Sequence, residues 1–304
     1  MRAHDLVTKF GLLKLWSDIF KAPCPADEYG RARHPDFLCV GSEKAGTTWL
    51  WNCMMQHPGI GVPASKELRF FNLFFTYDTN HFRALATFLE NPRESPSGPD
   101  FLERLATEIR LLHGGLPAYH RIFGQLSQPV VGEVTPQYCA QPLDQIRRMK
   151  EAAPEARIIY MLRDPVDRIL SGARMVATRN TEPLTDDLLL RYAADPFQRN
   201  LTDAATHLDN FDRVFGANRV KAFFFDDIAS RPAALLDDIC AFIGAERAEI
   251  PDTILRAKVN QGGAFQPSAA LKSKLYAEFA PLYNKLEQRH PRRVAGWRAR
   301  YSAQ

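Results

Sequence analysis

The chain alternates between short apolar runs and longer stretches in which apolar residues recur every three or four positions. A short apolar run bounded by turn residues predicts a buried strand, and the longer spacing predicts an amphipathic helix. Strands are predicted at 37–40, 60–63, 130–135, 157–162 and 220–225, and helices at 49–57, 141–153, 184–194, 201–215, 232–243 and 268–290. Because strands alternate with helices, the pattern predicts an α/β fold with a mostly parallel sheet of about five strands, covered by helices on both faces.

Two further stretches are apolar without belonging to this alternation. Residues 6–20 have apolar side chains at helical spacing with lysines around them, which predicts an amphipathic helix docked on the domain, on a second subunit or on an anionic membrane. The aromatic run at 70–75 predicts core packing or the wall of a substrate pocket. No repeat or linker divides the chain, so one domain is predicted over 1–304, with a helix and loop at 1–35 and an α/β core at 36–304 that carries helical inserts.

Composition narrows the class of protein. The 304 residues are 45% hydrophobic, enough for a sizeable core, and 39 basic against 35 acidic residues are too evenly balanced for a general nucleic-acid binder. Five widely spaced cysteines show no CxxC or Cys/His pattern and predict buried, reduced thiols without a metal site. No apolar run approaches 18 residues and no secretory signal precedes the core, which favours a cytoplasmic protein.

The first stretch with chemical content is FLCVGSEKAGTTWLW at 37–51. It predicts a buried strand, a turn with two glycines and a lysine, and the start of a helix. Backbone N–H groups at such a turn form an anion-binding nest, and Lys44 adds a positive charge. The order differs from the nucleoside triphosphate loop, in which lysine follows the second glycine. A glycine turn before an ordinary helix explains this stretch alone equally well.

The second stretch is RIIYMLRDPVDRILSGAR at 157–174. Its strand brings Arg163 to the carboxyl end of the sheet, where ligands of open α/β sheets bind, and Asp164 and Pro165 begin a helix. Ser171 lies two helical turns beyond Asp164 on the same face. Arg163 and Ser171 can therefore hold one phosphate together. The alternative is an Arg–Asp surface pair beside a solvated serine.

Taken together, the two stretches resemble the sulfotransferases that use 3'-phosphoadenosine 5'-phosphosulfate. The strand, the Lys-x-Gly-Thr-Thr-Trp sequence and the following helix resemble that family's 5'-phosphosulfate loop, and Arg-Asp-Pro followed by Arg and Ser resembles its 3'-phosphate site. The resemblance implies a P-loop NTPase-like three-layer sandwich and a sulfuryl donor that needs no metal. The residues that it assigns to the donor are Lys44, Ala45, Gly46, Thr47, Thr48, Trp49 beside the adenine, Arg163 and Ser171.

The third stretch, SKELRFF at 65–71, resembles the Lys-Glu-x-x-Phe-Phe sequence of the carbohydrate sulfotransferases, especially the heparan sulfate branch. In that branch the glutamate is the general base, which implies this role for Glu67, beside Lys44 as the other catalytic residue. An acceptor hydroxyl has a pKa far above 7, so a carboxylate must take its proton during attack. Small-molecule sulfotransferases use a histidine instead, and His113 or His120 is the alternative base.

Two departures from that branch leave the acceptor open. The stretch GEVTPQY at 132–138 resembles its Glu-Lys-Ser/Thr-Pro-x-Tyr sequence, but Val134 replaces the lysine. Near the C-terminus, the family's Lys-Gly loop over the 3'-phosphate has no counterpart, and Lys258 or backbone amides are expected to close the donor site.

The resemblance therefore implies transfer of a sulfuryl group, by in-line displacement, to a hydroxyl or amine of a carbohydrate or a small-molecule alcohol. Two other classes stay open on the sequence. A P-loop nucleotide kinase or NTPase shares the strand, loop and helix but needs magnesium, and a non-catalytic protein can use residues 6–20 to bind a membrane or form a homodimer. Neither explains Arg163 and Ser171 together with the first loop.

Overall fold

The computed structural model describes residues 31–72, 104, 107, 108, 111, 115–257 and 267–302. Its centre is a five-stranded sheet in the order β2-β3-β1-β4-β5, and every neighbouring pair of strands is parallel. The strands are β1 (Phe37–Gly41), β2 (Ile60–Gly61), β3 (Val130–Val134), β4 (Arg157–Leu162) and β5 (Val220–Phe224). The five predicted strands and the parallel sheet are confirmed. The second strand is shorter than predicted, since it ends before Pro63, which has no N–H to donate.

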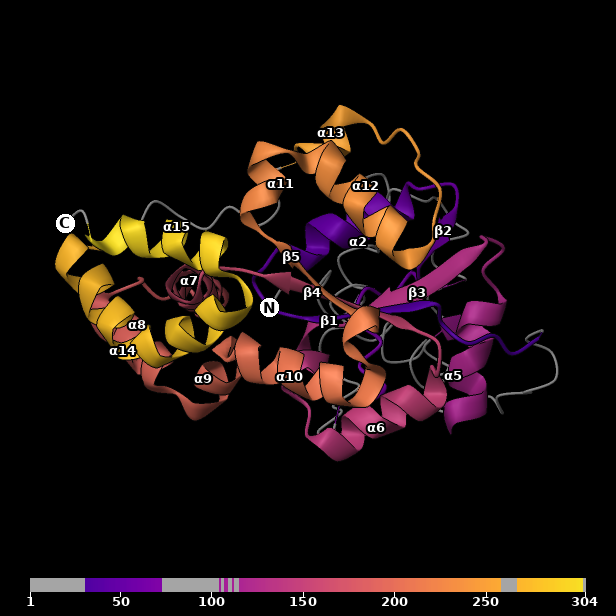
Figure 1. The fold of residues 1–304 in the computed structure, drawn as a ribbon, viewed down its shortest axis with the longest axis horizontal. Coiled ribbons are helices and arrows are strands. Elements are labelled where there is room, and N and C mark those ends of the chain that lie inside the picture. Colours follow the sequence, from indigo (N-terminus) through magenta and orange to yellow (C-terminus); the bar gives the residue numbers. More distant parts are fainter. Residues whose placement is uncertain are drawn as a thin grey trace, which may run out of the picture.

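Helices cover both faces of this sheet (Figure 1). The faces carry α5 (Gly115–Gly124), α6 (Leu143–Ala152) and α10 (Ala204–Phe215) on one side, and α2 (Thr47–Met55) and α12 (Pro232–Ile243) on the other. The remaining elements are α7 (Pro165–Asn180), α8 (Asp186–Ala194), α9 (Pro196–Thr202), α11 (Asp226–Ser230), α13 (Asp252–Leu255), α14 (Ala269–Arg289), α15 (Pro291–Ser302) and the 3₁₀ turns η1 (Pro136–Ala140) and η2 (Ala217–Arg219). The arrangement is the predicted three-layer α/β sandwich.

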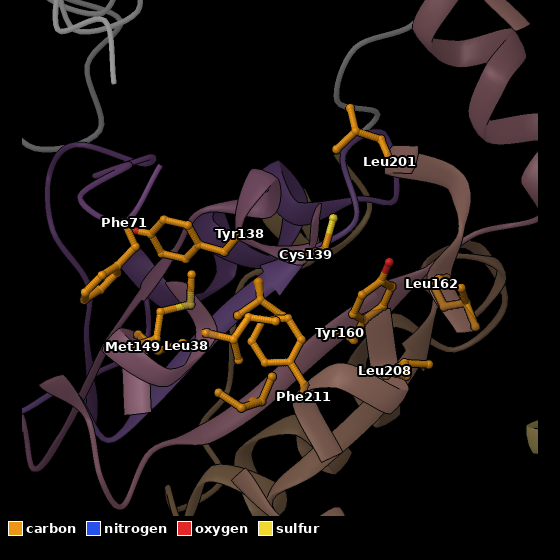
Figure 2. Close-up of a cluster of buried hydrophobic side chains, with 14 of the residues drawn as sticks. Leu38, Phe71, Tyr138, Cys139, Met149, Tyr160, Leu162, Leu201, Leu208 and Phe211 are labelled. Carbon is orange, nitrogen blue, oxygen red and sulfur yellow. The ribbon is translucent and has the colours of Figure 1, made fainter. Parts of the chain in front are cut away.

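The strands build two cores because their side chains alternate between the faces. Leu38 and Tyr160 face α6 and α10, where they pack in the cluster shown in Figure 2. Phe37 and Ile159, one position away on the same strands, lie in the second cluster, against α2 and α12. All five residues of β1 are buried. The central strand is therefore fixed from both sides, which holds rigid the loop that leaves its carboxyl end.

One helix boundary differs from the sequence prediction. The helix expected at 201–215 is divided into α9 and α10 at Asp203. The Asp203 carboxylate accepts a hydrogen bond from the N–H of Thr206 and so caps α10. Aspartate favours such caps over helix interiors, and the apolar spacing continues across the break and conceals it. The sequence pattern also does not predict helix α15, because four of its twelve residues are arginines and interrupt the apolar spacing.

Several predictions fall on residues that the structure does not describe: the amphipathic helix at 6–20 with its membrane or dimer contact, Phe74 and Phe75, His113 and Lys258. Among the described residues, Cys39, Cys53, Cys139 and Cys240 are buried free thiols, as expected. No helix in that part of the chain combines the length and the apolar character needed to cross a membrane. The single-domain organisation and the cytoplasmic location stay predictions.

Candidate active site

The loop after β1 is tied to the sheet and leaves a helix end open. The N–H of Ser42 donates to the Met161 carbonyl at 2.7 Å, which joins the loop to β4. Gly46 then precedes α2 with φ of 87°, and no side chain caps this helix. The first backbone bond of α2 runs from Leu50 N–H to the Gly46 carbonyl. The N–H groups of the first turn, at 47–49, therefore face outward without a capping acceptor, which is the arrangement that binds anions.

Gly46 meets two demands that only glycine satisfies. Its positive φ is strained for any other residue, and a Cβ atom would lie 2.3 Å from Ile228 Cδ1. Gly46→Ala should therefore lower the free energy of unfolding by more than the roughly 1–2 kcal/mol of left-handed strain alone, and should displace the anion-binding amides.

Gly244→Ala is the matched control for this prediction, because Gly244 has φ of 81° and a Cβ atom added there would meet no atom within 4 Å. Denaturant unfolding and turnover of the two variants separate strain from the clash. We expect both to lose stability and only Gly46→Ala to lose turnover. Equal stability and activity in the two variants would contradict this account of the loop.

Lys44 lies half-buried beside α7. Its Nζ donates to Met175 Sδ at 3.4 Å, and in the described part of the chain it forms no ion pair with a carboxylate. Burial lowers the pKa of Lys44 below its usual value, and the charges of Arg179, Arg163 and Arg168 act in the same direction against that of Glu43. A cation in such positive surroundings is stabilised when an anion binds. Met175 lies one turn beyond Ser171 on α7, so the loop faces the helix surface that carries Ser171.

Arg163, at the end of β4, braces the same loop. Its Nη1 donates to the Lys44 carbonyl at 2.8 Å, and its Nε is buried without an acceptor among the described residues. Burial lowers the pKa of this guanidinium, although its ordinary value is far above neutral. The Ser171 hydroxyl, half-buried on α7, forms no hydrogen bond within the described chain. Arg163, at the end of β4, and Ser171, on the following helix, thus each have a donor without an acceptor in the described chain.

The C-terminal hairpin, formed by helices α14 and α15, holds Asp164, the residue next to Arg163. Asp164 is 1% exposed and caps α7 by accepting the N–H of Asp167. Its Oδ1 also accepts the hydroxyl groups of Tyr283 on α14 at 2.8 Å and Tyr301 on α15 at 3.0 Å. Burial raises the pKa of Asp164 to about 6. Asp164 is therefore part of a buried junction of three helices, and the expected alternative of an Arg–Asp surface pair is wrong.

Phe225 is a site residue that the sequence pattern does not reveal. It follows β5, and its ring centroid lies 4.0 Å from the guanidinium carbon of Arg163. A Cβ atom on Gly46 would approach the same ring to 3.2 Å. The ring therefore packs between Arg163 and the loop. In the sequence, Phe225 is the last residue of an apolar run and is indistinguishable from the strand before it.

The Trp49 side chain, expected beside the adenine, is buried in the core. It is 2% exposed beneath α2, and its Nε1 donates to the Leu255 carbonyl at 2.9 Å. The indole thus anchors α2 to α13. The part of Trp49 in nucleotide binding stays a prediction. Its buried indole favours a contact through the main-chain N–H rather than through the ring.

Glu67 lies between two cations. Its Oε1 accepts from Lys66 Nζ at 3.0 Å, and its Oε2 accepts from Arg69 Nη2 at 2.5 Å and Nε at 3.0 Å. Burial alone would raise the pKa of Glu67, but Lys66 and Arg69 outweigh it and lower the pKa to about 2. Glu67 is therefore an anion at neutral pH.

The segment that carries Glu67 lies at the carboxyl end of β3. Asn72 Nδ2 donates to Gln137 Oε1 at 3.0 Å, and the Phe71 and Tyr138 ring centroids are 5.6 Å apart. Both contacts are to η1, which follows β3. Burial raises the pKa of Cys39, on the neighbouring β1, to about 12, and the charge of Lys66 opposes that rise. The Lys66–Glu67 segment and the loop at 41–46, which is the expected phosphate loop, thus share one edge of the sheet.

Glu133 is a second carboxylate near this edge. It is completely buried on β3 and accepts from Tyr119 at 2.6 Å and Thr135 at 2.7 Å, with Tyr138 at 3.3 Å. Burial raises the pKa of Glu133 to about 7. The adjacent Val134 is fully buried in the opposite core. Position 134 therefore contributes packing in this chain, where the carbohydrate branch has a lysine.

The alternative base His120 lies at the other edge of the sheet. Its Nε2 is 2.8 Å from the Ala152 carbonyl, and its ring centroid is 4.3 Å from that of His34. Ala152 precedes β4 and His34 precedes β1, so both contacts lie at the amino ends of strands. Six strand residues separate that edge from Arg163, about 20 Å. His120 is therefore too distant to act at the phosphate loop. Within the described residues, no three His, Cys, Asp or Glu side chains are grouped to hold a metal.

Comparison with known proteins gives this arrangement a family. The membrane-associated sulfotransferase kil1 of Dictyostelium discoideum is 28% identical over 141 residues, 45% of this chain and 22% of that protein, so the chain spans about a fifth of this curated relative's length. The crystal structure of a sulfotransferase from Alicyclobacillus acidocaldarius aligns with a TM-score of 0.59 and 26% identity, covering 87% of this chain and 98% of that one. The model of the sulfotransferase family matches residues 35–249, from the start of β1 to beyond α12. The chain belongs to the sulfotransferase family.

Proposed function

We propose that the protein transfers a sulfuryl group from 3'-phosphoadenosine 5'-phosphosulfate to an acceptor hydroxyl or amine by in-line displacement. The observation that carries this proposal is the group of unsatisfied donors along one sheet edge. The first-turn amides of α2 have no cap, Lys44 has no carboxylate partner in the described chain, and Arg163 Nε has no acceptor there. A ligand with phosphates at both ends of a nucleoside fits these donors.

Each donor has a separate task in this proposal. The donor substrate, when bound, supplies a sulfuryl group on a phosphate leaving group. Lys44 and the amides and hydroxyls at 46–48 neutralise the charge that grows on this phosphate during transfer. Arg163 and Ser171 hold the 3'-phosphate. The Phe225 ring beside Arg163 offers an apolar surface to the adenine ring of the nucleotide.

Glu67 is proposed as the general base for the acceptor. Its carboxylate is ionised at neutral pH, as a base must be, but its low pKa makes it a weak proton acceptor while Lys66 and Arg69 hold it. The acceptor oxygen becomes far more acidic as it bonds to sulfur, so a weak base suffices late in the transfer. Lys66 lies within 3.0 Å of Glu67 and is placed to turn toward the sulfuryl oxygens as the proton moves.

A carbohydrate or a small-molecule alcohol is the acceptor class that we propose. The order Lys66-Glu67-x-x-Phe70-Phe71 supports a carbohydrate, whereas the apolar Val134 removes one charge that the carbohydrate branch supplies. Turnover with a panel of oligosaccharides and simple alcohols decides between the two.

Thermal unfolding with 3'-phosphoadenosine 5'-phosphate and with ADP, in the presence of EDTA, tests the donor. At 100 times its dissociation constant a ligand stabilises the folded state by about 2.7 kcal/mol. We expect selective stabilisation by the 3'-phosphorylated nucleotide. Ser171→Ala should keep the melting temperature of the free protein and lose part of this selectivity. Equal stabilisation by ADP would instead favour a kinase or NTPase, as would stabilisation that appears only in a parallel experiment with magnesium in place of EDTA. No response under either condition would favour a non-catalytic protein.

A further inference from the structure

The segment at 62–65, between β2 and Lys66, has no regular secondary structure, yet side chains satisfy its backbone. The Val62 carbonyl accepts from Arg104 Nη2 at 3.2 Å, and the Pro63 carbonyl accepts from Trp51 Nε1 at 3.2 Å. Buried backbone groups need such partners, and each missing one costs about 1–3 kcal/mol. The path of this segment is therefore set by residues remote in sequence.

Glu108 provides the strongest of these contacts. Its Oε1 accepts the Ala64 N–H and its Oε2 accepts the Ser65 N–H, both at 2.8 Å. Glu108 is 3% exposed, and burial raises its pKa to about 7 although the two amides oppose that rise. The two bonds therefore form in a water-excluded place, where hydrogen bonds are strong. A carboxylate that accepts two consecutive amides fixes the direction of the chain as well as its position. The next two residues are Lys66 and Glu67.

We propose that Glu108 is a positioning residue of the transfer reaction, which holds the Lys66–Glu67 segment in register with the phosphate loop. Trp51 supports the same segment from α2, the helix that begins at that loop. The segment before Glu67 and the helix after the loop are thereby joined through the Trp51 side chain. Displacing a reacting group by about 1 Å can reduce the rate about 10²-fold. The hydrogen bonds from Glu108 are therefore expected to affect turnover. This inference rests on the proposed role of Glu67 as the base.

Glu108→Gln tests the proposal with little change of volume. The glutamine oxygen can accept one amide, but its NH₂ group faces the other N–H and cannot accept it. We expect kcat to fall about 10- to 100-fold, with the donor KM and the affinity for 3'-phosphoadenosine 5'-phosphate within about twofold of wild type. Trp51→Phe, which removes one bond to the same segment, should give a smaller loss of the same kind if Glu108→Gln folds poorly.

Asp36→Asn is the matched control. Asp36 also accepts a backbone N–H, that of Val131 at 2.8 Å, but at the amino edge of the sheet. It should lower the melting temperature and leave kcat unchanged. An equal loss of kcat in Asp36→Asn and Glu108→Gln, or an unchanged kcat in a folded Glu108→Gln, would overturn the positioning role.

A double-mutant cycle separates this proposal from the assignment of the base. If Glu108 acts through Glu67, Glu108→Gln should have no further effect on kcat in a Glu67→Gln background. Additive losses would overturn the positioning role while the base assignment stands. If Glu67→Gln alone keeps wild-type turnover, the base assignment fails, and a loss of kcat in Glu108→Gln would then have to arise elsewhere.

Discussion

Lys44→Ala is expected to lower kcat about 10²- to 10³-fold, the usual cost of removing one positioned electrostatic donor. Lys44 is the one side chain of the phosphate loop that carries a full positive charge, and its surroundings disfavour that charge until an anion arrives. In the proposed reaction the lysine therefore stabilises most when charge develops on the leaving phosphate, so kcat should fall more than donor affinity. The check is steady-state kinetics beside nucleotide binding by calorimetry.

The melting temperature should change little in Lys44→Ala, because among the described residues the Lys44 side chain donates only to Met175 Sδ, a weak acceptor. Lys285→Ala serves as the control, since it removes a lysine paired with Asp203 on the surface and should leave turnover unchanged. Activity of Lys44→Ala within a few fold of wild type would remove Lys44 from the catalytic residues.

Glu67→Gln is expected to lower kcat by about 10²- to 10⁴-fold, the range that general acid–base groups contribute. The amide cannot accept a proton, whereas the binding of 3'-phosphoadenosine 5'-phosphate, which we propose depends on Lys44 and Arg163, should be retained. The matched control is Asp212→Asn. Asp212 pairs with Arg289 at 2.6 Å and its side chain is 20% exposed against 22% for Glu67. The control should lose stability without losing turnover, and retained turnover in Glu67→Gln would move the base elsewhere.

The stability of the same variant should depend on pH. Since Lys66 and Arg69 outweigh burial and lower the pKa of Glu67 from 4.5 to about 2, the carboxylate stabilises the folded state above pH 4.5. This contribution is lost as the pH falls toward 2. The difference in melting temperature between wild type and Glu67→Gln should therefore be largest near neutral pH and shrink between pH 4.5 and 2. A constant difference would show that the ion pairs do not hold Glu67.

The strands could be predicted because their apolar runs are bounded by glycine, proline or charged residues. Helix ends were harder to predict wherever a cap interrupts a continuous apolar stripe, as Asp203 does between α9 and α10. The place of the loop at 41–46 could be predicted because strand, glycine turn and helix start are contiguous, and the place of Arg163 because it directly follows β4. No sequence pattern predicted the contacts of these residues with Phe225, Met175 and the C-terminal hairpin.

Sequence by itself determined the α/β class, the five parallel strands and the short-range chemistry of the loop, because each depends on neighbours within a few positions. Tertiary structure decided the rest. It placed the indole of Trp49 in the core, brought Tyr283 and Tyr301 to Asp164 across more than a hundred residues, and set Glu108 against the segment before Glu67. A buried carboxylate requires partners, but its local sequence does not say which ones, since only the packing of the whole chain brings them within hydrogen-bonding distance.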